Sequence, residues 1–285
     1  MNFFNATGIE SDARSAQSKL RNAFKTANNR HTVSLGDRQL LKGADRYSLS
    51  AANCYARIRW GEAVCADLAA FFCDDPQMPH HNQELHFVTL TDVACVTLVS
   101  AQDVSINFIA QRLRNGLRGM SYVAVIEPAL YVNLQVGVRF QGKRCLSWHL
   151  HAVVWGLSKK EIKARIETLN ASGRFRALAP GLDGAHSTVI EQGTLPQVIG
   201  YMLKPPVNGY RISRYDIERD GDPVINDDGE VQAKFIQGKA KLRPGERVSL
   251  FHAMKHLHLD QLTIAGGQGV PLLQRAKRKA LVQSR

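Results

Sequence analysis

Two histidines set one residue apart in an apolar segment have the type and spacing to do chemistry. The segment 146–156, LSWHLHAVVWG, contains His149 and His151. Side chains alternate between the faces of a strand, so residues i and i+2 project from the same face. If this segment is a strand, the two rings lie together while Leu150 and Ala152 point into a core. Two neutral imidazoles on one face can bind one metal ion, although most H-x-H pairs are structural.

A second pair with the same spacing, His256 and His258, offers a comparison. It lies in FHAMKHLHLDQL, residues 251–262, where apolar residues recur with a helical period. On a helix, i and i+2 lie about 200° apart around the axis, so these rings cannot share a metal ion. His252 and His256 have i, i+4 spacing without the glutamate of an H-E-x-x-H motif, and we assign the region to packing or surface.

A divalent ion needs further ligands, and Glu127 is the first candidate. It lies in VAVIEPAL, residues 123–130, in a predicted strand that precedes the histidine strand. Hairpin pairing of the two strands would bring the carboxylate beside the imidazoles. His86, at the start of an earlier strand, is the competing candidate. The structural alternative for Glu127 is a strand-end residue that faces water ahead of Pro128.

A tyrosine and a lysine share one face of a predicted helix near residue 200. In QVIGYMLKPP, residues 197–206, Tyr201 and Lys204 are three residues apart, while Val198 and Met202 can pack beneath them. A phenol is a weak nucleophile at neutral pH, but a nearby ammonium and a metal-polarised phosphate favour attack by the phenolate. The alternative is a half-buried tyrosine at a helix edge.

The elements that must position these side chains alternate in type. Strands are predicted over 85–91, 121–130, 146–156 and 187–193, and helices over 100–119, 158–173 and 194–206. Ser158 and Glu161 have capping-box spacing, as do Thr194 and Gln197. The order β-α-β-β-α-β-α predicts an α+β fold, an antiparallel sheet with helices on one face, as in ferredoxin-like or RRM-like domains.

The flanking regions differ in composition from this central part. Residues 1–46 are polar and basic and are expected to form a poorly ordered arm, and residues 49–73 are alanine-rich and helical with an interruption near Gly61. Prolines mark a boundary near residue 80. The predicted parts are therefore a polar basic arm and helical extension (1–80), a catalytic domain (81–205) and a basic C-terminal region (206–285).

The C-terminal region supplies cations that suit a polyanion. Its basic residues are Lys234, Lys239, Lys241, Arg243 and Arg247, followed by the run LLQRAKRKALVQSR at 272–285. Such runs can bind duplex phosphates, although most are solvated surfaces. Gly266, Gly267 and Gly269 lack a preceding predicted strand and a P-loop lysine, so no nucleotide site is expected. Residues 218–230 are acidic without calcium-loop spacing and are predicted to form a turn-rich loop.

Overall composition makes a polyanion such as a nucleic acid the obvious partner, although a merely basic soluble protein fits the charge equally well, and it predicts a cytoplasmic location. Lys and Arg number 37 against 25 Asp and Glu, a formal charge of +12 over 285 residues, and such a surplus informs on partners rather than on fold. Five cysteines without a C-x-x-C pair indicate reduced, buried thiols. We predict no membrane partner, because the N-terminus has no signal-peptide pattern and no window approaches about 18 apolar residues.

Three motifs in this order resemble the HUH endonuclease superfamily, and within it the rolling-circle replication initiator (Rep) proteins with a single catalytic tyrosine. FVTLT (87–91) is similar to the first motif of the family, HLHAVVW (149–155) to its histidine motif, and YMLK (201–204) to its tyrosine motif. The resemblance covers about residues 84–205. Relaxases of the same superfamily carry the tyrosine ahead of the histidines, so the order favours an initiator or a transposase. A single tyrosine followed by lysine favours the initiator.

The resemblance implies a metal-assisted transesterification on single-stranded origin DNA. His149, His151 and Glu127 would hold Mn²⁺ or Mg²⁺, Tyr201 would attack the scissile phosphate, and Lys204 would position or stabilise the reacting groups. The expected products are a 5′-phosphotyrosine and a free 3′-OH primer. The choice of metal comes from the resemblance, because histidines with few carboxylates also suit zinc.

The implied partners are single-stranded and duplex origin DNA and a host helicase. Two alternatives to the initiator stay open. One is an HUH transposase, and the other is a non-enzymatic nucleic-acid-binding domain, which would need stacking aromatics on the sheet face. Trp148 and Trp155 flank the histidine strand, but Trp148 has the parity of Leu150 and is expected on the face away from His149.

Overall fold

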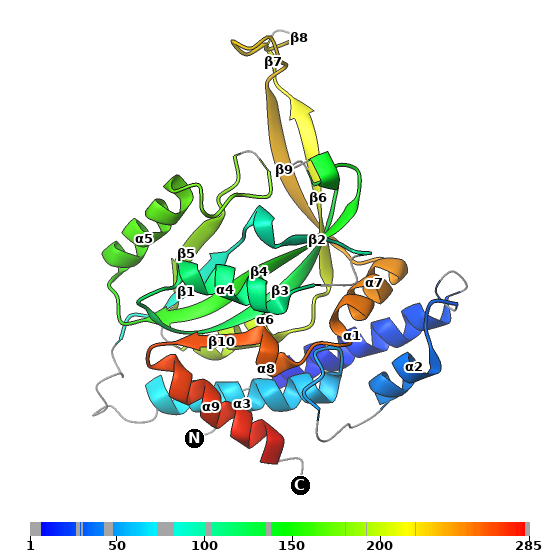
Figure 1. Ribbon diagram of the computed structural model, residues 1–285, viewed down its shortest axis with the longest axis vertical. Helices are drawn as coiled ribbons and strands as arrows, with labels where there is room; N and C mark the ends of the chain where they lie inside the picture. The colour runs from blue at the N-terminus through cyan, green and yellow to red at the C-terminus, as the bar shows by residue number, and fades with distance from the viewer. Residues whose placement is uncertain are drawn as a thin grey trace.

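The computed structural model describes residues 7–26, 29, 31–42, 48–72, 83–100, 104–134, 138–179, 181–191, 193–219 and 221–282. Two long antiparallel strands, β3 (Ser121–Val132) and β4 (Arg144–Trp155), form the centre of the fold (Figure 1). They pair along their whole length, from Ser121 opposite Trp155 to Val132 opposite Arg144. Both are rich in β-branched and aromatic residues, which suit a pleated and buried surface. A turn containing the 3₁₀ segment η2 (Val138–Phe140) connects them.

The other strands extend this central pair into a mostly antiparallel sheet. Its order is β5-β1-β4-β3-β6-β9, with β2 also pairing with β4 and β10 also pairing with β3. These strands are β1 (His86–Leu90), β2 (Val96–Leu98), β5 (Ala185–Val189), β6 (Asn208–Asp216), β9 (Ala233–Lys241) and β10 (Thr263–Gly266). Only the β3–β6 pairing within this sheet is parallel among the described strands. The four predicted strands and the general α+β class are confirmed.

Helices cover both faces of the sheet, and the expectation of helices on a single face is wrong. On the face that carries His149, Trp155 packs against two phenylalanines of α3 (Cys54–Phe72). On the opposite face, Gly116 at the end of α4 (Ile106–Gly116) lies against Leu90 of β1. Both faces need cover because β4 is apolar on both: Leu150 and Trp155 have opposite parity and are both fully buried.

The N-terminal region is helical and packed, so the expectation of a poorly ordered arm over 1–46 is wrong for its described residues. They form α1 (Thr7–Lys25) and α2 (Leu35–Lys42), and α1 contacts α3 and α7. Ile9 of α1 lies close to Gly61 of α3. A Cβ at position 61 would be 3.0 Å from the Ile9 side chain. This close approach explains the glycine, and α3 continues through it without the predicted interruption. The boundary expected near residue 80 lies outside the described residues.

One of the two predicted capping boxes is present. Ser158 caps α5 (Lys159–Ala171), accepting from the Glu161 backbone N–H at 3.4 Å while the Glu161 carboxylate accepts from Ser158 N–H at 2.8 Å. The second box is wrong, because Thr194 is helical at the start of α6 (Leu195–Leu203) and makes no side-chain cap. The Thr194 hydroxyl instead donates to the Glu191 carbonyl.

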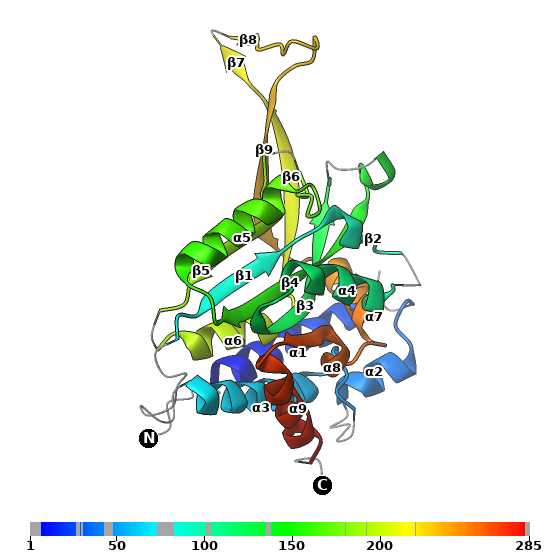
Figure 2. The same ribbon diagram turned by 60° about the vertical axis from the view of Figure 1, so that its left-hand side comes forward.

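The C-terminal region forms a long ribbon and helices that pack against α1 and α3. Strands β6 and β9 leave the body together and project from it (Figure 1, Figure 2). The predicted turn-rich loop is the tip of this ribbon and contains the two-residue strands β7 (Glu218–Arg219) and β8 (Asp222–Pro223). The chain then returns to the body as α7 (Pro244–Met254), α8 (Leu259–Leu262), β10 and α9 (Gly269–Val282).

A strand does precede the glycines at 266–269, contrary to the sequence-based expectation. Strand β10 ends at Gly266, and Gly267 has a positive φ of 53° that turns the chain into α9. A Cβ at Gly269 would collide with the carbonyl oxygen of Tyr122. These glycines therefore allow a tight strand-to-helix turn against β3.

One hydrophobic core joins residues from all three predicted parts of the chain. It includes Ile9 of α1, Trp60 of α3, Leu150 of β4 and Leu272 of α9. Four cysteines are free and buried as predicted, namely Cys54, Cys65, Cys95 and Cys145. Cys73 lies outside the described residues. None of the described helices combines the length and apolarity that crossing a bilayer requires.

Candidate metal centre

His149 and His151 lie on the same face of β4, as their spacing predicts. Their Nε2 atoms are 3.0 Å apart, and the rings meet edge to face with centroids 4.6 Å apart. The intervening Leu150 and the following Ala152 are fully buried on the other face. The strand alternation alone brings the two ligand atoms together.

The second nitrogen of each imidazole has a partner within the sheet. His151 Nδ1 is 2.9 Å from the hydroxyl of Thr89, which lies opposite it in β1, and His149 Nδ1 is 3.3 Å from the Ser147 carbonyl oxygen. A protonated Nδ1 donates to these oxygens and leaves Nε2 as the metal ligand, an arrangement that also fixes the ring orientation. Thr89 belongs to the FVTLT motif, but its role depends on strand register and was not identified from the sequence.

Glu127 completes the group of possible ligands. It lies directly opposite His149 in the β3–β4 pair, and its Oε2 is 3.9 Å from His151 Nε2. One ligand atom from each of the three residues lies within 4.8 Å of the others. His86, the competing candidate, is excluded from the ligand group. It and Thr89 project from opposite faces of β1, so His86 points away from His149 and His151. The residue is 1% exposed, and its Nε2 atom lies 3.7 Å from Oε2 of Glu84.

The donor set fits a divalent metal ion. Two neutral imidazoles and one carboxylate are ligands that Mn²⁺, Fe²⁺ and Zn²⁺ accept. Adjacent ligands of an octahedral ion with bonds of about 2.1 Å are separated by about 3 Å, and the two Nε2 atoms are 3.0 Å apart. The structure therefore supports a metal site formed by Glu127, His149 and His151 and does not identify the metal.

Burial prepares the three side chains for metal binding in different ways. Desolvation lowers the pKa of His149 to about 4 and the pKa of His151 well below its usual value, so both rings are neutral at neutral pH. Desolvation also raises the pKa of Glu127 to about 7, against the opposing effect of Lys204 and Arg57. A bound cation would favour the Glu127 carboxylate, as these two positive side chains do.

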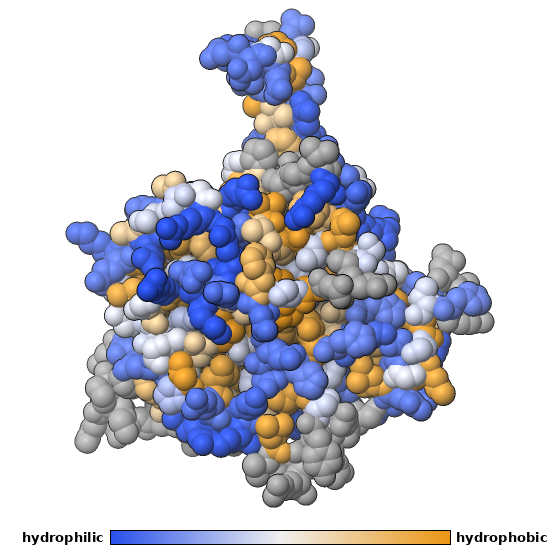
Figure 3. Space-filling view, in the orientation of Figure 1, coloured by the Kyte–Doolittle hydropathy of each residue, from blue (hydrophilic) through white to orange (hydrophobic). Residues whose placement is uncertain are grey.

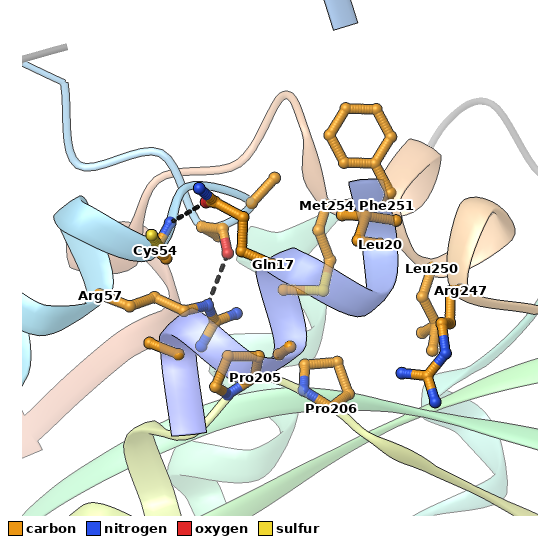
Figure 4. A pocket seen from close by; sticks show the side chains of 14 residues that line it. Gln17, Leu20, Cys54, Arg57, Pro205, Pro206, Arg247, Leu250, Phe251 and Met254 are labelled. Atoms are coloured by element: carbon orange, nitrogen blue, oxygen red, sulfur yellow. Dashed lines mark hydrogen bonds between the residues drawn. The ribbon is translucent and has the colours of Figure 1, made fainter. Parts of the chain in front are cut away.

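Arg57 of α3 links the N-terminal layer to the centre. Its buried guanidinium donates to the carbonyl oxygens of Ala51 at 2.7 Å and Leu203 at 3.1 Å, and approaches that of Lys204 at 3.5 Å. Figure 4 shows it between Gln17 and Pro205 at the edge of an apolar pocket. Since Leu203 ends α6, Arg57 fixes the end of the helix that carries Tyr201. Sequence patterns give no signal for this contact between distant segments.

Tyr201 lies beside the histidines. Its ring centroid is 5.2 Å from that of His151 and 5.8 Å from that of Phe87, and the residue is 38% exposed. Lys204 follows α6 as its C-cap, with Nζ 3.5 Å from the centre of the Tyr201 ring. The two side chains are together as predicted, but the ammonium contacts the ring face. Burial and the Glu127 carboxylate raise the pKa of Tyr201, so the lysine alone does not favour the phenolate.

Two depressions open at this centre. A small hollow is lined by the three possible ligands together with Tyr201, Lys204 and Lys239. A neighbouring cleft of about 430 Å³ shares the two histidines and Tyr201 and extends toward the ribbon. His186 of β5, which the sequence analysis did not single out, lies opposite Thr89 and lines this cleft.

The remaining candidates lie elsewhere. His256 and His258 are exposed in the connection between α7 and α8 and not on a helix, and neither belongs to a group of possible ligands among the described residues. Trp148 is buried on the face away from His149, as predicted, and donates to Thr97. Trp155 is buried beneath α3 on the histidine face.

The predicted phosphate-binding cations are distributed unevenly. Among those of the C-terminal region, Lys239 alone lines the small hollow. In the terminal run, Arg275 and Lys279 pair with Asp67, and Lys277 pairs with Asp260. These three contacts attach α9 to the body, so part of the positive charge of this run is already engaged within the protein.

The chain matches no protein-family model, and no solved structure matches it.

Proposed function

We propose that this protein nicks single-stranded DNA by tyrosine transesterification, as an HUH endonuclease of the replication-initiator type. The observation that carries the proposal is the position of Tyr201, whose ring lies 5.2 Å from that of His151 beside a group of metal-competent side chains. A tyrosine on a helix next to metal ligands on a sheet provides the nucleophile and the electrophilic activation that phosphoryl transfer requires.

The reaction exchanges one phosphodiester bond for another. The Tyr201 oxygen bonds to the scissile phosphorus and the bond to the 3′ oxygen breaks; the phenol gives up a proton and the 3′ oxygen gains one. The products are a 5′-phosphotyrosine and a free 3′-OH, and attack by a later 3′-OH reverses the step. A divalent ion, proposed to be Mn²⁺ or Mg²⁺ and held by His149, His151 and Glu127, would supply polarisation of the phosphate.

The cations around the hollow support a phosphate substrate. Lys204 and Lys239 line it, and the buried Arg57 lies close enough to influence the pKa of Glu127. Their positive charge would attract the phosphodiester and stabilise the charge that develops on it. A host helicase, and duplex DNA bound by the remaining basic residues, are partners that the same proposal implies.

The proposal is tested with a random-sequence pool of single-stranded DNA incubated with the protein and Mn²⁺. We expect a covalent adduct that survives denaturation, requires the metal ion, and disappears in Tyr201→Phe. Sequencing the captured DNA locates the nick and identifies the preferred sequence. The control is Tyr215→Phe, which alters an exposed tyrosine on the ribbon and should leave the adduct unchanged.

Two outcomes would contradict the proposal. An adduct that persists in Tyr201→Phe would show that another residue is the nucleophile. Metal-independent DNA binding without any adduct would favour the non-enzymatic nucleic-acid-binding domain, an alternative that Phe87 and Tyr210 beside the histidines also suit.

A further inference from the structure

The two depressions at the centre differ in charge. Lys204 and Lys239 line the small hollow beside the possible metal ligands. The larger cleft has no lysine or arginine among its described lining residues, and its wall instead carries Asp183 and His186. A phosphate is favoured in the hollow and disfavoured next to Asp183. The cleft therefore suits an uncharged part of a nucleic acid.

The ribbon contributes an aromatic surface to this cleft. Tyr210 at the base of β6 stacks on Tyr131 of β3, with ring centroids 5.0 Å apart and planes 19° apart. Both tyrosines line the cleft, and Tyr210 offers the more accessible ring because it is partly exposed whereas Tyr131 is buried. Phe87, stacked on His151 at 5.2 Å, lines the same cleft. Flat rings of this kind bind unstacked nucleobases.

Polar groups beside these rings could read a base edge. The Tyr131 hydroxyl donates to Oε1 of Gln237 on β9 at 3.1 Å, which holds the amide at the cleft and leaves its NH₂ group as a donor. Asp183 offers acceptors on the other wall. The volume of about 430 Å³ lies within the range of about 300–1,000 Å³ typical of small-ligand sites.

We propose that the cleft binds one unstacked base of the DNA strand, next to the scissile phosphate in the small hollow, and that Tyr210 stacks on this base while Gln237 selects it. The inference rests on the proposed function and adds a base-specific subsite to it. Figure 3 shows hydrophilic side chains at the ribbon tip and apolar ones toward its junction with the body. Tyr210 and Gln237, which line the cleft, come from the part of the ribbon near the body.

The subsite predicts a sequence preference at a single position. In the random-pool experiment with Mn²⁺, the adducts of the wild-type protein should show a base preference at one nucleotide beside the nick. Gln237→Leu should lose the preference at that nucleotide and keep preferences elsewhere. Gln274→Leu, on the exposed face of α9, is the matched control and should resemble the wild type.

A second measurement separates base stacking from damage to the fold. Tyr210→Ala should weaken binding of the selected oligonucleotide by about 10-fold or more, the effect of losing one base–aromatic stack. An abasic residue at the same nucleotide should weaken wild-type binding similarly and add little to the effect of Tyr210→Ala. A general loss of folding would add to the abasic effect instead.

The outcomes distinguish this inference from the function on which it rests. Absence of any adduct would overturn the proposed function and, with it, the inference. An adduct whose base preferences are the same in Gln237→Leu and the wild type would overturn the inference alone, as would fully additive effects of Tyr210→Ala and the abasic residue.

Discussion

The two H-x-H pairs of this chain have the same spacing and opposite structural outcomes. His149 and His151 lie in a central strand, with Nε2 atoms 3.0 Å apart and Glu127 opposite them. His256 and His258 lie in an exposed connection between two helices. The comparison shows that the spacing alone does not create a metal site. The backbone conformation and the neighbouring strands decide whether two imidazoles converge.

The first pair also differs in the shell of contacts that surrounds it. Thr89 and the Ser147 carbonyl occupy the two Nδ1 atoms, and desolvation keeps both rings neutral. Pre-oriented neutral imidazoles bind a metal ion without first losing protons or rotamer freedom. We therefore expect Mn²⁺ affinity to change most when a ligand is removed, less when an outer contact is removed and least when the pH is changed.

The largest effect is expected from removing a ligand of the first pair. His151→Ala should weaken Mn²⁺ binding by more than about 100-fold, beyond the range seen for loss of an outer-shell partner. His256→Ala, which truncates the exposed member of the second pair, should leave the affinity unchanged. Calorimetric titration of each variant with Mn²⁺ measures both. Equal weakening by the two substitutions would contradict the assignment of the metal site.

Loss of an outer-shell contact should have a smaller effect. Thr89→Val keeps the shape of the side chain and removes the hydroxyl that lies 2.9 Å from His151 Nδ1. We expect Mn²⁺ affinity to fall by about 10–100-fold, with Thr89→Ser restoring most of it. If Thr89→Ser binds as weakly as Thr89→Val, the hydroxyl does not orient the ring.

Local sequence patterns were sufficient for the elements that carry the site. The alternation in LSWHLHAVVWG predicted the strand and the shared face of His149 and His151, and the spacing of Ser158 and Glu161 predicted the capped start of α5. Glu127 was reached through hairpin pairing, which places it opposite His149 as expected. These features depend on residues close together in the sequence and on one hairpin pairing, so the periodicity of the sequence is enough to predict them.

Long-range packing accounts for what the sequence did not predict. Thr89 reaches His151 through the β1–β4 pairing, and Arg57 reaches the end of α6 across 146 residues. The helical arm was missed because the few apolar residues of α1, such as Ile9 and Phe24, become significant only against α3 and α7. Register and tertiary contacts of this kind have no local sequence signature.

The smallest effect is expected from changing the pH, because burial lowers the pKa values of the first histidine pair and raises the pKa of Glu127. Because desolvation lowers the pKa of His149 to about 4 and the pKa of His151 well below its usual value, both rings are neutral near pH 7 and protons do not compete with the metal ion for their nitrogens. Glu127, with a pKa raised to about 7, is protonated below pH 7 and must lose that proton to bind. Mn²⁺ affinity should therefore rise about fivefold between pH 6 and pH 7 and by no more than about twofold above pH 7. Glu127→Gln should bind more weakly with no rise over this range. A rise that persists in Glu127→Gln would assign the titrating group to another residue and remove the carboxylate from the ligand set.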